Sequence, residues 1–205
     1  MIKAVLFDYG GVLSEGGGIG SVRHMWAGAL GIEDAAVKDI GQTTHSLLMT
    51  GEVSDEAFLQ ELHSYHPEAK SPTIEAMLAH TNIFSSSKPV YKLASRLQHH
   101  HIKTGVLSNM YAFSADALKE RGLLDGFDVV LLSCEAHLMK PDPEFYALAA
   151  KKLGVPSKEI LFIDDRSEML ATAERMGMQT ILAKNAAQIV QDTEQKVRAQ
   201  NHIEL

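Results

Sequence analysis

Residues 2–13 read IKAVLFDYGGVL. Five of the first six residues in this run are apolar, which predicts a short strand buried on both faces of a parallel sheet. The strand ends at Asp8, and Gly10 and Gly11 follow it. Glycines let the backbone turn sharply and leave amide N–H groups open to a close ligand. A carboxylate held at a strand end beside such amides indicates chemistry on an anion.

Two later apolar runs predict strands of the same kind, and each also ends at polar side chains. They are residues 104–107, followed by Ser108 and Asn109, and residues 160–163, followed by Asp164 and Asp165. Ligands of open parallel sheets bind outside the carboxyl ends of the strands. We therefore expect all of these side chains to meet Asp8 at one edge of one sheet.

From about residue 87 onward, strands and helices are predicted to alternate. The strands are 104–108, 128–132, 160–163 and 180–182, and the helices are 89–98, 114–121, 143–153, 168–176 and a polar helix after Asn185. Within this pattern Asp142 is placed to cap a helix that Pro143 begins and Gly154 ends. This alternation predicts an α/β fold with a doubly wound, Rossmann-like parallel sheet.

The region between the first strand and this alternating part has a different character. Residues 14–20 are rich in glycine, and residues 21–78 predict short helices, two of them with Ser21 and Ser54 as N-caps. We therefore expect an α/β core domain made of residues 1–14 and 86–205, with a small helical domain, residues 15–85, inserted into it. The glycine-rich stretch would serve as the hinge between them.

Composition excludes several classes of protein. The 205 residues carry a formal net charge of -7 and an isoelectric point near 5.8, whereas binding to nucleic acid or to an anionic membrane needs a basic face. The single cysteine, Cys134, rules out a disulfide within the chain and is expected to be buried. Because we see neither a secretion signal nor an apolar run that could span a bilayer, we expect a soluble cytoplasmic protein, monomeric or homodimeric.

Four short motifs carry a resemblance to a known family. In chain order they are Phe7 to Leu13, Ser108-Asn109, Lys140-Pro141-Asp142 and Ile163-Asp164-Asp165. Together they resemble the four ordered motifs of the haloacid dehalogenase-like (HAD) hydrolase superfamily. The helical insertion is similar to the small cap of the subfamily that includes the phosphatase domain of soluble epoxide hydrolase and bacterial sugar-phosphate phosphatases. The resemblance covers nearly the whole chain.

The resemblance implies a Mg²⁺-dependent hydrolase, specifically a phosphatase acting on a small phosphorylated metabolite such as a sugar phosphate. Asp8 would be the nucleophile and would form an aspartyl phosphate, which divides one difficult displacement into two easier ones. Mg²⁺ would be held by the Asp8 side chain, the Gly10 carbonyl oxygen and Asp165, with Asp164 acting through a water. A set of oxygen ligands with retained waters suits this ion.

The remaining motif residues would hold the phosphoryl group. By the same resemblance, Ser108 would donate its hydroxyl to the phosphoryl oxygens, together with Asn109 and the Gly11 amide. Lys140 would neutralise both the phosphate and the crowded carboxylates. Within the helical domain, Arg23, His24 and Trp26 are candidates for contacting the substrate, although Trp26 fits the core of that domain better.

One position departs from the family pattern. Most phosphatases of this superfamily have a second Asp two residues after the nucleophile, where it protonates the leaving oxygen, and this chain has Gly10 there. Three consequences stay open: slow hydrolysis or a preference for good leaving groups, a substitute acid such as Glu15, or binding without turnover. The alternatives to a phosphatase are therefore a 2-haloacid dehalogenase-type hydrolase and a catalytically weak module that binds a phosphorylated ligand.

Overall fold

A five-stranded parallel sheet forms the centre of the molecule in the computed structural model, which describes residues 1–15, 19–37 and 42–205. The strands are β1 (Ala4–Phe7), β2 (Lys103–Ser108), β3 (Val129–Leu132), β4 (Ile160–Asp164) and β5 (Gln179–Leu182). Their order across the sheet is β3-β2-β1-β4-β5. The predicted parallel α/β fold is confirmed, and β1 lies in the middle.

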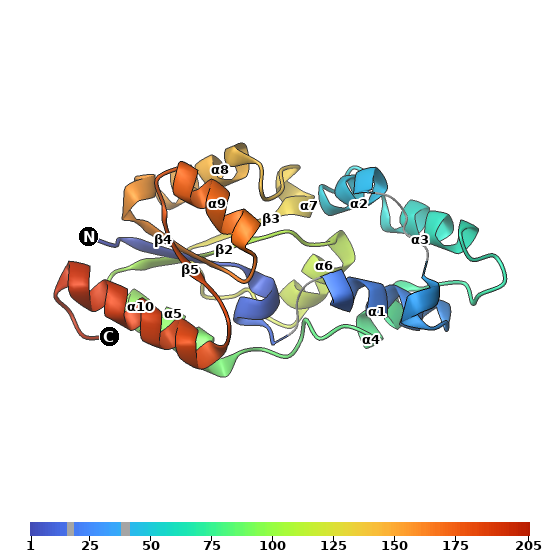
Figure 1. The fold of residues 1–205 in the computed structure, drawn as a ribbon, viewed down its shortest axis with the longest axis horizontal. Coiled ribbons are helices and arrows are strands. Elements are labelled where there is room, and N and C mark those ends of the chain that lie inside the picture. The colour runs from blue at the N-terminus through green and yellow to red at the C-terminus, as the bar shows by residue number, and fades with distance from the viewer. Residues whose placement is uncertain (16–18, 38–41) are drawn as a thin grey trace.

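Helices cover both faces of the sheet. They are α5 (Lys88–His99) and α10 (Ala186–Asn201) on one face, and α8 (Pro143–Leu153) and α9 (Ser167–Arg175) on the other, as Figure 1 shows. Val5 and Phe7 of β1 belong to the core on the α5 and α10 side, whereas Ala4 and Leu6 belong to the core on the opposite side. This alternation explains why the first strand is apolar throughout.

Several helix ends lie where the sequence predicts them. The Asp142 side chain accepts a hydrogen bond from the Glu144 N–H and caps α8, and Gly154 ends that helix in a left-handed conformation. Ser54 likewise caps its helix by accepting from the Ala57 N–H. The predicted N-cap at Ser21 is wrong, because the helix already begins at Ile19 and Ser21 lies inside it. The glycine-rich sequence before this helix has no side chain that would mark Ile19 as its first residue.

The region between β1 and α5 folds as helices. These are α1 (Ile19–Leu30), the short helix Asp34–Ala36, α2 (Gln42–Met49), α3 (Asp55–Ser64) and α4 (Ile74–Ala79). They share a separate apolar cluster that includes Trp26, Leu48 and Phe58 and that continues into the core through Tyr111 and Phe113. Figure 1 shows them at the end of the molecule toward which β1 runs. We call this group of helices the cap.

The two chain segments that join the cap to the core run side by side. Ser14 and Ser86 form an antiparallel bridge, and the Glu15 N–H donates to the Ser85 carbonyl at 2.7 Å. Of the predicted hinge, residues 16–18 lie outside the described residues. A domain division at residues 14 and 86 stays a prediction.

A second junction lies at the turn after α2, where the cap packs onto the short helix α7 (Ser133–Ala136). The Ser133 hydroxyl, which is fully buried, donates to the Met49 carbonyl at 2.6 Å and accepts from the Met110 N–H at 2.9 Å. Gly51 approaches so closely that a Cβ there would stand 2.3 Å from the Cys134 carbonyl oxygen. The close packing makes this turn a fixed point of contact between cap and core.

Within the described residues, none of the helices combines the length and the apolar character needed to cross a membrane. Cys134 is buried, as expected.

Candidate active site

Three neighbouring strands deliver the predicted polar residues to one edge of the sheet. Asp8 directly follows β1, Ser108 ends β2, and Asp164 ends β4, with Asp165 next to it. One carboxylate oxygen from each of the three aspartates can be chosen so that the three atoms lie within 4.8 Å of one another. Ser108 is buried, with 2% of its surface exposed. The structure thus brings together side chains that are as much as 157 residues apart in sequence, from Asp8 to Asp165.

The turn after Asp8 has one unusual residue. Gly11 has a φ of +72°, a backbone conformation that residues with a side chain rarely adopt. A Cβ at this position would stand 2.5 Å from Asp165 Oδ2. Glycine therefore allows the turn to approach the acidic pair. Gly10 differs, because its φ of −67° and ψ of 127° are open to any residue. The backbone of this turn therefore does not itself require glycine at position 10.

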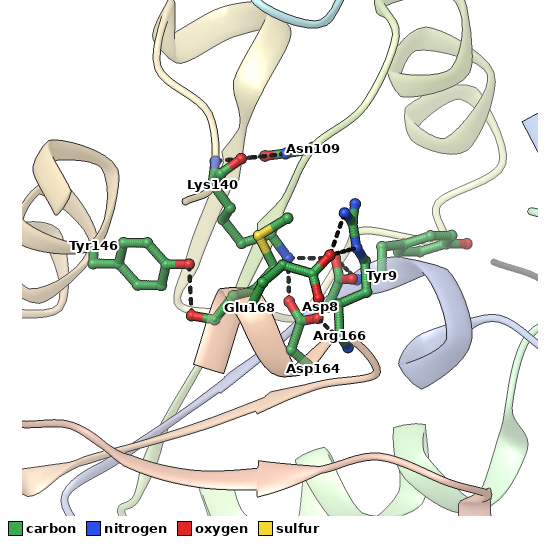
Figure 2. Close-up of polar contacts among 9 residues, drawn as sticks. Asp8, Tyr9, Asn109, Lys140, Tyr146, Asp164, Arg166 and Glu168 are labelled. Atoms are coloured by element: carbon green, nitrogen blue, oxygen red, sulfur yellow. Dashed lines mark hydrogen bonds and ion pairs between the residues drawn. The ribbon is translucent and has the colours of Figure 1, made fainter. Parts of the chain in front are cut away.

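Lys140 lies at the centre of the acidic cluster. Only 2% of the residue is exposed, and its Nζ lies 3.0 Å from Asp8 Oδ1 and 2.5 Å from Asp164 Oδ2 (Figure 2). Burial alone would lower the pKa of the Lys140 ammonium, but the two carboxylates outweigh it and the pKa is raised. The lysine therefore stays charged and is shared between the two strands.

One lysine does not balance three carboxylates. Burial raises the pKa of Asp165, and the neighbouring Asp8 charge adds to this effect. Burial likewise raises the pKa of Asp164, against the opposing influence of Lys140. This surplus of negative charge on oxygen ligands fits a hard divalent cation such as Mg²⁺.

The hydrogen bonds within the cluster separate the roles of the three acids. Asp164 uses both oxygens, because Oδ2 accepts from Lys140 and Oδ1 accepts from the Arg166 N–H at 2.9 Å. Asp8 accepts from the Tyr9 N–H at 2.7 Å on Oδ1, the oxygen that also faces Lys140. The bonds described for Asp8 thus fall on one oxygen, while Oδ2 is left for a ligand. The roles of Asp8 and Asp165 as direct metal ligands and of Asp164 as an indirect one stay a prediction.

Asn109 has a different environment from the one expected. Its side-chain Nδ2 donates to the Lys140 carbonyl at 2.8 Å, and its Oδ1 accepts from the Lys140 N–H at 2.7 Å. The amide therefore clamps the backbone that carries Lys140. The bond from Nδ2 uses one of the two Nδ2 hydrogens, so a contact from Asn109 to a phosphoryl group stays a prediction.

The three cap residues that are candidates for contacting the substrate make contacts within the cap. Arg23 donates to the Val37 carbonyl at 2.8 Å, and His24 lies 3.2 Å from the Asp34 carboxylate. Trp26 is 6% exposed and packs against Phe58, so its assignment to the cap core is confirmed. The Glu15 side chain is exposed at the start of the cap connection.

Sequence reasoning did not single out Ser133, Arg166 or Glu168. Ser133 gives no local signal, because its two hydrogen-bond partners are distant in sequence. Arg166 could have been noticed, since it directly follows the acidic pair. Its side chain pairs with Glu168 beside the cluster (Figure 2).

The protein has a parallel sheet, acidic side chains clustered at the strand ends and a helical insertion after the first strand. The HAD-like hydrolases share this arrangement. Residues 2–177 match the family model of the haloacid dehalogenase-like hydrolases, and the chain belongs to this family. The predicted family is confirmed, and the protein is a hydrolase of the HAD superfamily.

Curated relatives include much longer proteins. The chain is 25% identical over 94% of its length to acyl-CoA dehydrogenase family member 10 of Mus musculus, and 28% identical over 54% to bifunctional epoxide hydrolase 2 of Rattus norvegicus. It spans only 19% and 21% of those two proteins. It is also 27% identical, over 91% of its length, to D-ribitol-5-phosphate phosphatase of Bacteroides thetaiotaomicron and covers 94% of that enzyme.

Solved structures share the fold. A predicted HAD-like family hydrolase from Porphyromonas gingivalis superimposes with a TM-score of 0.78 at 26% identity, covering 98% of this chain and 100% of that one. The HAD family enzyme BT-2542 from Bacteroides thetaiotaomicron, in complex with magnesium and inorganic phosphate, has a TM-score of 0.68 at 22% identity over 92% of this chain and 99% of its own.

A substitution at Gly11 tests whether the turn positions Asp165. We expect Gly11→Ala to weaken Mg²⁺ binding, measured by isothermal titration calorimetry, at least about tenfold, because the added methyl group displaces the Asp165 carboxylate. Gly177→Ala is the matched control: Gly177 has a φ of +83° but nothing within 4 Å of the added Cβ. Both variants should lose about 1–2 kcal/mol from backbone strain. Equal Mg²⁺ affinities in the two variants would contradict this role.

A second prediction concerns Lys140. Without metal, Lys140→Met should lower the free energy of unfolding by about 3–5 kcal/mol, because it leaves buried carboxylates without a countercharge. Lys119→Met, which removes an exposed lysine paired with Glu135, should cost at most about 1 kcal/mol. Mg²⁺ should raise the melting temperature of Lys140→Met more than that of the wild type. A Mg²⁺ response no larger than that of Lys119→Met would argue against charge compensation by Lys140.

Proposed function

We propose that this hydrolase is a Mg²⁺-dependent phosphatase that acts on a small phosphorylated metabolite through Asp8. The observation that carries the proposal is the cluster of three carboxylates at the ends of β1 and β4, two of them paired with the buried Lys140, with Ser108 at the end of the adjacent strand β2. A relative named as a D-ribitol-5-phosphate phosphatase and a structural neighbour bound to magnesium and phosphate support it. A sugar phosphate is accordingly one candidate substrate.

Asp8 would act as the nucleophile through one carboxylate oxygen and would contact Mg²⁺ through the other. Its Oδ1 is held by the Tyr9 N–H and faces the Lys140 ammonium, which fixes the plane of the carboxylate. The attacking oxygen would form a bond to phosphorus as the bond from phosphorus to the ester oxygen breaks. Water would then attack the aspartyl phosphate, releasing inorganic phosphate and restoring Asp8.

Other residues would stabilise the phosphoryl group. The Ser108 hydroxyl at the end of β2 and the Gly11 N–H in the turn after β1 would donate to the phosphoryl oxygens, and Lys140 supplies positive charge inside the cluster. Asp8, Asp165 and the Gly10 carbonyl would hold Mg²⁺, with Asp164 behind them. When bound, the ion supplies positive charge for the phosphoryl oxygens.

The departing ester oxygen needs a proton, and Gly10 has no side chain to give one. Proton transfer from a positioned group contributes about 10²–10⁴-fold to a rate. Substrates with better leaving groups, such as acyl phosphates and sugar 1-phosphates, would therefore be favoured. A substitute acid would have to come from elsewhere, and Glu15 is the candidate that the sequence offers.

The function is tested by phosphate release from p-nitrophenyl phosphate and a panel of phosphorylated metabolites, with Mg²⁺ and with EDTA. We expect Mg²⁺-dependent turnover in the wild type and a loss of at least about 10³-fold in Asp8→Asn, because the nucleophile is removed. Asp125→Asn, at an exposed aspartate, is the control and should retain full activity.

Two results would redirect the proposal. Turnover by Asp8→Asn equal to that of Asp125→Asn would reject Asp8 as the nucleophile. If every phosphate is left intact, chloride release from 2-chloropropionate in EDTA would identify a dehalogenase. If neither phosphate nor chloride is released, the remaining function is that of a module that binds a phosphorylated ligand.

The missing acid can be restored. Gly10→Asp should raise activity toward glycerol 3-phosphate, whose alkoxide leaving group needs a proton, by about 10²-fold or more, and should raise activity toward p-nitrophenyl phosphate much less. The Gly10 backbone conformation accepts an aspartate without strain. Gly10→Asn is the control, with the same size and no acidic proton. If Asp and Asn have the same effect, or if neither raises activity, another residue already supplies the proton.

A further inference from the structure

Arg166 lies at the active site but has no role in the mechanism described above. It follows Asp164 and Asp165 directly, in the loop between β4 and α9. Its backbone N–H donates to Asp164 Oδ1 at 2.9 Å, which fixes the start of its side chain against the acidic cluster. A guanidinium group is therefore attached to the same loop that would hold the metal.

The Arg166 side chain has an exchangeable partner. Its Nε donates to Glu168 Oε1 at 2.8 Å, and a second guanidinium nitrogen contacts the same oxygen. The two side chains are 40% and 54% exposed. Figure 2 shows the Arg166 side chain extending past Asp8 in this view, with its guanidinium joined to Glu168. Exposed ion pairs contribute little to stability, so an anionic ligand can replace Glu168.

Glu168 does not depend on Arg166 to remain charged where it is. It lies in the first turn of α9, where the helix dipole favours a negative charge. Separating the pair therefore leaves the carboxylate in a favourable place. It also frees a guanidinium, whose planar set of donors matches a carboxylate or a phosphate.

The arrangement of charges in the site favours a contact between Arg166 and another part of the substrate, not the reacting phosphoryl group. Lys140 is fully occupied between Asp8 and Asp164, deep in the cluster. Arg166 is half-exposed, so its charge lies toward the solvent side of the same site. A second negative group on a substrate, a few bonds from the phosphoryl group, would meet this charge first.

We propose that Arg166 binds a second anionic group of the substrate, so that the enzyme prefers phosphate monoesters that also carry a carboxylate or a second phosphate. Glu168 holds the guanidinium in place until the substrate arrives. The inference rests on the proposed function only in that it places the reacting phosphoryl group at Asp8.

Binding measurements test this without requiring turnover. Calorimetry with Mg²⁺ on the Asp8→Asn protein would compare 3-phosphoglycerate with glycerol 3-phosphate, which has a neutral CH₂OH in place of the carboxylate. We expect 3-phosphoglycerate to bind at least fivefold more tightly. Adding Arg166→Gln should abolish this preference and leave glycerol 3-phosphate within twofold.

Two further variants sharpen the test. Glu168→Gln should strengthen 3-phosphoglycerate binding, because it releases Arg166. Arg198→Gln, which removes an exposed arginine paired with Glu204, should change neither ligand. Fructose 1,6-bisphosphate and fructose 6-phosphate distinguish a second phosphate from a carboxylate as the preferred anion. In the active enzyme, the same preferences should appear in KM.

The possible outcomes separate this inference from the proposed function. Arg166-dependent preference for a second anion in a protein that hydrolyses no phosphate would uphold the inference and reject the phosphatase. Turnover of p-nitrophenyl phosphate without such a preference would do the reverse. Equal loss of both ligands in Arg166→Gln, or no measurable binding of any of the four, would overturn the role assigned to Arg166.

Discussion

The buried ammonium group of Lys140 is the interaction on which the site depends. It faces Asp8, which follows the central strand β1, and Asp164, which ends the neighbouring strand β4. Without a positive charge at this point, three carboxylates with ligand atoms within 4.8 Å would repel one another in a poorly solvated place. The lysine therefore makes it possible for two strand ends to carry acids side by side.

Lys140 is itself held by a chain of contacts that reaches the cap. Asn109 clamps its backbone with two hydrogen bonds, and the next residue, Met110, donates to Ser133. Ser133 in turn donates to Met49 at the end of α2. The loop after β2 is thus bound both to Lys140 and to the turn after α2 in the cap. Fixing the cap and fixing the charge centre are parts of one buried network.

How much of this could be predicted depends on the range over which the information acts. Neighbouring residues are enough to predict the strand at residues 4–7, the polar residues at the strand ends and the helix N-cap at Asp142. Burial, turns and helix capping act locally. The general placement of ligands outside the carboxyl ends of parallel strands then predicts that these strand ends meet.

Other features are long-range and have no local pattern. Asn109 is predicted to contact phosphate, but nothing near it in sequence indicates that its side chain also holds the backbone of Lys140, a partner 31 residues away. The docking of Met49 on Ser133 joins residues 84 positions apart, and nothing near either one marks it. The start of α1 was misplaced because glycine-rich sequence carries no capping signal. Sequence thus located the acids but not the contacts that hold them.

The loss of a side chain at position 10 makes the remaining charges more important. Where a positioned acid is absent, a rate must come mainly from stabilising negative charge, and this site has a buried positive charge in Lys140 and an exposed one in Arg166. The two differ in burial, and so in what each can do. The buried lysine is shared by two acids and cannot follow a ligand, whereas the exposed arginine can exchange partners. A division of labour follows, in which Lys140 organises the reacting centre and Arg166 selects what reaches it.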